Sequence, residues 1–195
     1  MHYSKTQNHN FELKTNSDKL ISVHGGYRNL IAYKNAVIVY DLTNKFCQQN
    51  IKDYKLKSQI LGAARSGKQN IAEGSVASGT SKKIELKLVS IARASLEELL
   101  QDMEDFLRQR DLELWSKTND QVKGIRELAY QQDRSYKTYE SYFKKQEDFA
   151  NCIICVVHQT NYLLDKLLNS LEKEFLEKGG FSERMYRSRI RTFYS

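Results

Sequence analysis

The residue types best suited to metal or redox chemistry lie together on one predicted helix. Cys152, Cys155 and His158 follow one another at intervals of three residues, which places three potential ligands on one helical face. A structural zinc site normally has four ligands, so Cys47 or His24 would have to complete it. Because both cysteines of the pair lie in an apolar run, where free thiols behave as small hydrophobic groups, core packing is the favoured interpretation. We predict no metal site and no cofactor.

A glycine-rich segment comes close to a phosphate-binding loop. Residues 62–69 read Gly-Ala-Ala-Arg-Ser-Gly-Lys-Gln, near the pattern Gly-x4-Gly-Lys-Ser/Thr. That loop needs a hydroxyl after the lysine to hold magnesium and a strand before the first glycine. Gln69 takes the place of the hydroxyl and the segment keeps a helical period, so we do not expect nucleotide hydrolysis here.

Acid–base chemistry has few other candidates. Four carboxylates recur at helical spacing, but a di-iron bundle would also need Glu-x-x-His motifs on facing helices, which this sequence lacks. A solvated face, or ion pairing with neighbouring lysines, is the favoured role of these carboxylates, which are Glu97, Glu98, Asp102 and Asp105. No histidine is placed as the base of a serine nucleophile. We therefore predict that the protein is not an enzyme.

Charge points to a polyanionic partner. The formal net charge is +7 and the pI about 9.2. Residues 52–87 hold eight basic and three acidic side chains, whereas residues 95–113 hold seven acidic and two basic ones. Such a field can steer a polyanion; the alternative is neutralisation by neighbouring helices or subunits. We expect phosphate contacts from Lys55, Lys57, Arg65, Lys68, Lys82, Lys83 and Lys87, supported by Arg187, Arg189 and Arg191.

Aromatic residues also alternate with cations between residues 130 and 145. Rings among cations can stack single-stranded bases, and they can equally pack the start of a helix. Both interpretations stay open for Tyr130, Tyr136, Tyr139, Tyr142 and Phe143, interleaved with Arg134, Lys137, Lys144 and Lys145.

The elements that must position these groups are helical almost throughout. The chain of 195 residues contains no proline, and apolar residues recur every three or four positions. Helices are predicted at about 29–49, 53–73, 81–110 and 141–178, with residues 111–140 ambiguous. This pattern predicts an all-α, up-down-up-down four-helix bundle over 27–178, with an extended third-to-fourth connection. A flexible tail (1–26) and a basic C-terminal helix or arm (179–195) flank it.

Details of the helical hairpin carry further expectations. Gly74 is predicted to cap the second helix, and Ser78, Thr80 or Ser81 to cap the third. The small residues Gly62, Ala63, Ala64 and Gly67 predict a close packing seam. The third helix carries two apolar stripes, which implies burial on two sides, one of them against another subunit.

The same hairpin resembles a known family, the four-helix bundle proteins. That family includes proteins encoded by intervening sequences in bacterial 23S rRNA genes and the accessory variability determinants of diversity-generating retroelements. The resemblance rests on a glutamine-led helix ending in Asn-Ile-Ala-Glu-Gly, a basic loop, and a Ser-Leu-x-Glu-Leu element. It covers residues 27–110 well, and residues 179–184 resemble a C-terminal suffix of one subgroup. The motif residues, given a structural role, are Gln59, Asn70, Glu73, Gly74, Ser95 and Glu98.

The resemblance implies a homopentamer and a nucleic acid partner, RNA more than DNA. A non-enzymatic, oligomeric, RNA-binding bundle is the leading hypothesis. The alternative is an interaction scaffold serving as accessory subunit of a reverse transcriptase. No apolar run approaches the length of a membrane span, and three cysteines suit a reducing compartment, so we expect a cytoplasmic protein with no membrane partner.

Overall fold

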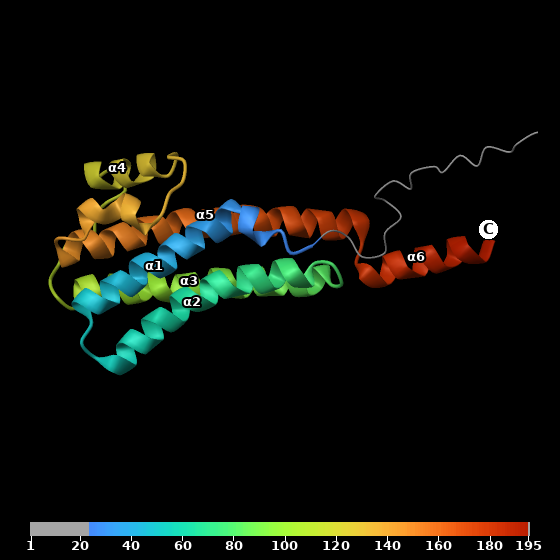
Figure 1. The fold of residues 1–195 in the computed structure, drawn as a ribbon, viewed down its shortest axis with the longest axis horizontal. Helices are drawn as coiled ribbons and strands as arrows, with labels where there is room; N and C mark the ends of the chain where they lie inside the picture. Colours follow the sequence, from blue (N-terminus) through green and yellow to red (C-terminus); the bar gives the residue numbers. More distant parts are fainter. Residues whose placement is uncertain (1–23, 195) are drawn as a thin grey trace, which may run out of the picture.

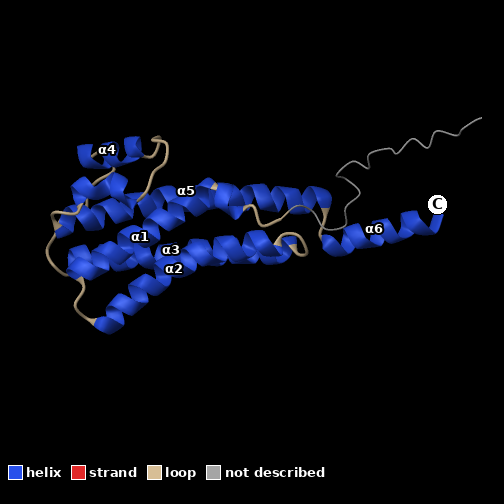
Figure 2. Ribbon diagram, viewed as in Figure 1, coloured by secondary structure: helices blue, strands red, loops and turns tan. Residues whose placement is uncertain are grey.

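The computed structural model describes residues 24–194, with side chains for all but residues 178, 191, 192 and 194. These residues are mostly helical and contain no strand (Figures 1 and 2). The four long helices are α1 (Ile31–Asn50), α2 (Tyr54–Ala77), α3 (Lys82–Arg108) and α5 (Gln146–Lys178). Helix α1 packs on α2 and α5, and α3 packs on the same two helices. The predicted all-α four-helix bundle is confirmed.

Short connections with side-chain caps set the register of the hairpin. The Asp53 carboxylate accepts a bond from the Leu56 amide (2.6 Å) at the start of α2, and the Ser81 hydroxyl accepts one from the Ile84 amide (3.2 Å) at the start of α3. Ser81 was among the predicted caps. These bonds satisfy amides that a helix start leaves unpaired.

The predicted cap at Gly74 is wrong. Helix α2 continues to Ala77, and Gly74 is buried within it. A Cβ at this position would lie 3.3 Å from the Glu85 carbonyl oxygen and 3.3 Å from Leu88 Cβ. The glycine is therefore needed for the close approach of two backbones, and the loop begins only after Ala77.

The core is a continuous apolar seam between the four helices. The Phe46 ring packs edge-on against Phe106 (4.8 Å between centroids) and Phe149 (5.3 Å). Each large apolar side chain buried in this way contributes about 1.5–3 kcal/mol. Cys47 and Cys152 are fully buried in the same seam, as the packing interpretation of these thiols requires.

The long third-to-fourth connection folds back over α5. It contains α4 (Asp120–Leu128) and the 3-10 helix η3 (Tyr136–Tyr142), which lie against α5 (Figure 1). The Asn151 side chain holds its beginning, since it accepts a bond from the Trp115 amide (2.9 Å) and donates one to the Glu113 carbonyl (2.8 Å). The ambiguous stretch is thus a broken helix that covers α5.

Beyond the bundle, helix α6 (Phe181–Tyr194) extends away from its end (Figure 1). Gly179 takes a positive φ of 70° and turns the chain there, which favours glycine. The predicted C-terminal arm is a helix. At the other terminus, the 3-10 helix η2 (Tyr27–Asn29) precedes α1, and the Gly25 amide bonds the Ser75 carbonyl (3.0 Å). The predicted flexible tail lies outside the described residues up to residue 23.

Candidate nucleic-acid interface

Exposed cations gather at the end of the bundle where α2 turns into α3. Lys83 and Lys87, one helical turn apart on α3, are exposed and form no ion pair with any described residue. Their neighbour Lys82 is different, because its ammonium contacts Glu85 (3.0 Å) and Glu174 of α5 (3.2 Å). Lys82 therefore joins the helices, and Lys83 and Lys87 are left for a partner.

Helix α6 starts at this same end of the bundle (Figure 1). Lys82 contacts Glu174 near the end of α5, and α6 follows α5 directly in the chain. Its basic residues include Arg187 and Arg189, both exposed. The Nε and Nη2 atoms of Arg184 are shielded from solvent and have no hydrogen-bond partner among the described residues. A guanidinium in that state is stabilised by an anion. Arg191 lies on α6, but its side chain is not described.

We call Lys83, Lys87, Arg187 and Arg189 the turn-end cluster. Two exposed rings stand on the same arm, Tyr186 (67% exposed) and Phe193 (88% exposed). The sequence reasoning did not select these rings, although they alternate with arginines just as the tyrosines after residue 130 alternate with cations. Cations beside exposed rings are the combination that binds single-stranded nucleic acid.

The lysines at the start of α2 lie elsewhere. A helix of 24 residues is about 36 Å long, so Lys55 and Lys57 stand at the far end of the hairpin from Lys83. Burial raises the pKa of the Cys47 thiol, the charge of Lys57 lowers it, and the charge of Asp102 raises it. Lys57 therefore lies near the acidic half of α3. Tyr54, 84% exposed, also stands among these lysines and was missed in the sequence. The start-of-α2 cluster (Lys52, Lys55, Lys57) is therefore partly offset by α3 carboxylates.

Two predicted contacts lie between the ends of α2. Arg65 is exposed and has no ion pair among the described residues. The Lys68 ammonium stands 4.2 Å from the centre of the Tyr40 ring on α1, a cation–π contact that holds it on the bundle. The predicted cations thus occupy two ends and the middle of the hairpin instead of one compact patch.

Acidic residues of α3 gather toward the other end of that helix. Burial raises the pKa of Asp102, and the carboxylates of Glu98 and Asp105 raise it further. Arg93 pairs with Glu97 (2.6 Å) and with Asp165 on α5 (3.2 Å). These carboxylates form a partly paired face, as the sequence interpretation favoured.

The motif residues of the hairpin hold α2 against α3. The Asn70 amide donates to the Ser66 carbonyl (2.9 Å) and hydroxyl (3.0 Å), and the Ser66 and Ser95 hydroxyls are 2.9 Å apart. Gly67 fits beneath Leu96, because a Cβ there would stand 2.5 Å from Leu96 Cδ2. Gln59, Glu73 and Glu98 are exposed on the same hairpin. The small-residue seam is confirmed at Ala63, Ala64 and Gly67, whereas Gly62 faces open space.

The thiols and most of the aromatic cluster serve packing. Burial raises the pKa of Cys47 and of Cys155 to about 11 and that of Cys152 well above its ordinary range. No group of three metal-ligating side chains occurs in the described part of the chain. Tyr139 is fully buried and Phe143 stacks on Phe149 at 4.3 Å, so the helix-packing interpretation is right for these rings.

Comparison with known proteins agrees with the hairpin geometry. Residues 30–112, which span α1, α2 and α3, match the family described as 23S rRNA-intervening sequence protein. This part of the chain is similar to that family. The match ends where the long connection over α5 begins, so α4, η3 and α6 lie outside it. No curated protein matches the chain significantly, and neither does any solved structure.

The match relates residues 30–112 to a family that is described by an rRNA. It does not extend to the retroelement subgroup. Within residues 24–194, no helix has the length and apolar character needed to cross a membrane.

Proposed function

We propose that this protein binds RNA, largely independently of sequence, through the turn-end cluster. The observation that carries the proposal is that Lys83 and Lys87 are exposed and unpaired among the described residues, at the end where the basic helix α6 begins. Phosphate contacts of this kind dominate affinity and release counterions. The rings of Tyr186 and Phe193 add stacking surface for unpaired bases.

RNA is proposed ahead of DNA because the family that residues 30–112 match is described by an rRNA. The geometry favours the turn end over the start of α2, because the start of α2 lies beside the acidic half of α3. Carboxylates near a phosphate site repel the ligand. The lysines at the start of α2 should therefore contribute less to RNA affinity than the same number of cations at the turn end.

The test compares two triple variants that remove the same charge. Lys83→Ala/Lys87→Ala/Arg189→Ala removes three of the four cations of the turn-end cluster, and Lys52→Ala/Lys55→Ala/Lys57→Ala removes the start-of-α2 cluster. Fluorescence anisotropy with a labelled single-stranded RNA should show at least about tenfold weaker binding for the first variant and a clearly smaller loss for the second. Equal losses, or a larger loss at the start of α2, would reject this location.

Self-association is part of the proposal. Ile84 (48% exposed) and Ile91 (39% exposed) lie on one stripe of α3 that the described chain leaves partly exposed. On α2, nothing lies within 4 Å of the Cβ position of Gly62, and Val76 is 54% exposed. Small and apolar residues on two packed helices suit a helix of a second copy. The resemblance noted above implies five copies, which would bring several turn-end clusters into one particle.

We propose a binding role without catalysis. The buried thiols are protonated at neutral pH because their pKa values are raised, which makes them poor nucleophiles. The turn-end cluster would also fit an acidic protein surface such as that of a reverse transcriptase. If RNA displaces an acidic protein partner from the turn-end cluster in a competition assay, both ligands use the same surface.

A further inference from the structure

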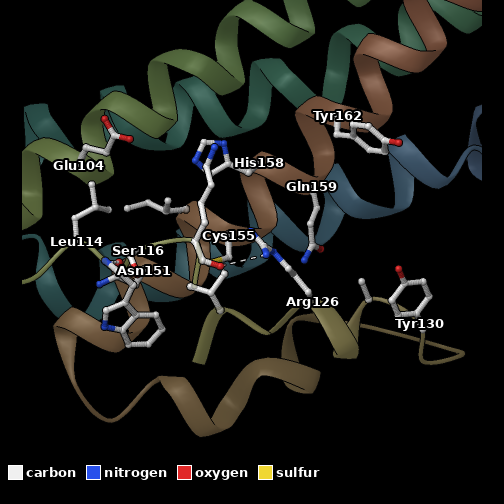
Figure 3. A pocket seen from close by; sticks show the side chains of 15 residues that line it. Glu104, Leu114, Ser116, Arg126, Tyr130, Asn151, Cys155, His158, Gln159 and Tyr162 are labelled. Atoms are coloured by element: carbon white, nitrogen blue, oxygen red, sulfur yellow. Dashed lines mark hydrogen bonds between the residues drawn. The ribbon is translucent and has the colours of Figure 1, made fainter. Parts of the chain in front are cut away.

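A cavity lies between α5 and the connection that covers it, away from the cationic surface. Its volume is about 710 Å³, within the usual range of small-molecule sites. Apolar and aromatic side chains form most of its wall, among them Trp115, Val122 and Ile154, with Tyr130 and Tyr162 at one side (Figure 3). Almost all of the lining comes from residues beyond the family match.

One polar group in this cavity lacks the partners that its chemistry requires. Both amide atoms of Gln159 are shielded from solvent and have no hydrogen-bond partner in the described part of the chain. Figure 3 shows this side chain pointing from α5 into the cavity, between Arg126 and Tyr130. A buried amide without partners is costly, so a ligand with a matching donor and acceptor would stabilise it.

Arg126 supplies a positive charge to the cavity, and its side chain is exposed. Its one hydrogen bond among the described residues runs from Nη1 to the Lys117 carbonyl (3.3 Å), and no carboxylate pairs with it there. Burial raises the pKa of the Cys155 thiol, which also lines the cavity, and the charge of Arg126 partly offsets this rise. The acidic lining residue, Glu104, lies across the cavity from Tyr130 (Figure 3). An anionic group is therefore favoured on the Arg126 side.

We propose that this cavity binds a mononucleotide. A nucleobase is planar and carries adjacent donor and acceptor atoms, which the Gln159 amide can pair, while Trp115 and Tyr130 offer rings for stacking. The phosphate then meets the Arg126 guanidinium, which suits its geometry. A long-chain fatty acid would use Arg126 and leave the amide unpaired. A free nucleotide and one nucleotide of an RNA strand share this chemistry.

The chain reports on this site by itself, because Trp115 is its single tryptophan. Tryptophan emission of the full-length protein is followed during titration with the four ribonucleoside 5′-monophosphates, with the matching nucleosides, and with a short RNA. At least one monophosphate should change the emission saturably, and its nucleoside should bind more weakly. Arg126→Gln should weaken binding about tenfold and Gln159→Leu about threefold to tenfold.

Lys123→Gln is the matched control, since Lys123 lies on α4 and pairs with Asp120 (2.8 Å) outside the cavity. This variant should bind like the unmodified protein, and circular dichroism melts show that each variant is folded. If only the RNA changes the tryptophan emission saturably, and Arg126→Gln abolishes this change, the cavity binds one nucleotide of an RNA strand and not a free nucleotide. Absence of saturable change with every ligand, or affinities in folded Arg126→Gln and Gln159→Leu equal to that of the unmodified protein, would overturn the proposal. The turn-end variant serves as a separate arm, because it should lose RNA affinity without changing mononucleotide binding.

Discussion

Lys82 and Glu85 form an ion pair of 3.0 Å at the first turn of α3, and the same ammonium reaches Glu174 of α5 at 3.2 Å. Burial raises the pKa of Glu85, and the Lys82 charge opposes this shift. Burial disfavours the charge of Lys82, but its bonds to Glu85 and Glu174 outweigh that effect and raise its pKa. The adjacent Lys83 is exposed and has no ion pair in the described chain. Two neighbouring lysines thus have different roles.

Lys82→Ala should lower the free energy of unfolding by about 1–3 kcal/mol, because it leaves the nearly buried Glu85 carboxylate unpaired. Lys83→Ala should change stability by less than about 0.5 kcal/mol. RNA affinity should show the opposite order, with the larger loss in Lys83→Ala. Urea unfolding and RNA anisotropy on both variants measure this. A larger RNA effect at Lys82 than at Lys83 would contradict the assignment of roles.

Gly67→Ala should destabilise the fold by about 1–3 kcal/mol, the usual cost of overpacking. The added Cβ would meet Leu96 Cδ2 at 2.5 Å, and Leu96 is fully buried, so it has little space to move. Gly62→Ala is the control on the same helix, since nothing lies within 4 Å of its Cβ position. That change should stabilise α2 by about 0.5–1 kcal/mol. Thermal unfolding of both variants checks the contrast, and equal effects would show that the seam is misplaced.

Asp102→Asn should raise the melting temperature at pH 7. The folded state raises the pKa of Asp102 through burial and the nearby Glu98 and Asp105, so the folded chain holds this proton more tightly than the unfolded chain. Stability is therefore lost as pH rises from the ordinary value of 3.8 through the raised pKa. The gain from Asp102→Asn should vanish near pH 3.

The matched control for this pH series is Asp133→Asn. Asp133 is exposed on the connection and has a φ of 54°, a conformation that asparagine accepts. Its melting temperature should follow the unmodified protein at both pH values. A gain from Asp102→Asn that is equal at pH 3 and pH 7 would show that packing, and not titration, causes it.

Ile84→Ser/Ile91→Ser should convert an assembly into single chains. Light scattering of the unmodified protein should give several times the chain mass of 22.8 kDa, about fivefold if the implied pentamer forms. The control is Ile31→Ser on α1, which removes a more exposed isoleucine (60%) from a different helix and should leave the mass unchanged. An unmodified protein that weighs one chain would reject self-association.

Helix periodicity and absent proline were enough to predict the bundle, because the apolar stripes of α1, α2, α3 and α5 are long and regular. The end of α2 was misplaced because Gly74 looks the same in sequence whether it caps a helix or admits a neighbouring backbone. The distinction depends on Glu85 and Leu88, which contact it only in the fold.

The sequence was enough to identify the basic residues of the candidate surface, but not which of them lie together in the fold. Charge counts identify Lys55 and Lys83 alike, but the length of α2 separates them. Lys82 differs from Lys83 through its ion pairs with Glu85 and with Glu174 on another helix. The connection over α5 has a weak period, so its cavity and the unpartnered Gln159 amide were not visible in the sequence.

The most direct measurement is the salt dependence of RNA binding. The logarithm of the association constant, measured between 50 and 200 mM salt for the unmodified protein, should fall steeply with the logarithm of salt concentration. Lys83→Ala/Lys87→Ala/Arg189→Ala should reduce the magnitude of that slope by about 2, since each lost contact with a single strand contributes about 0.7. Affinity that does not change with salt, or a slope identical in the variant, would contradict RNA binding at the turn-end cluster.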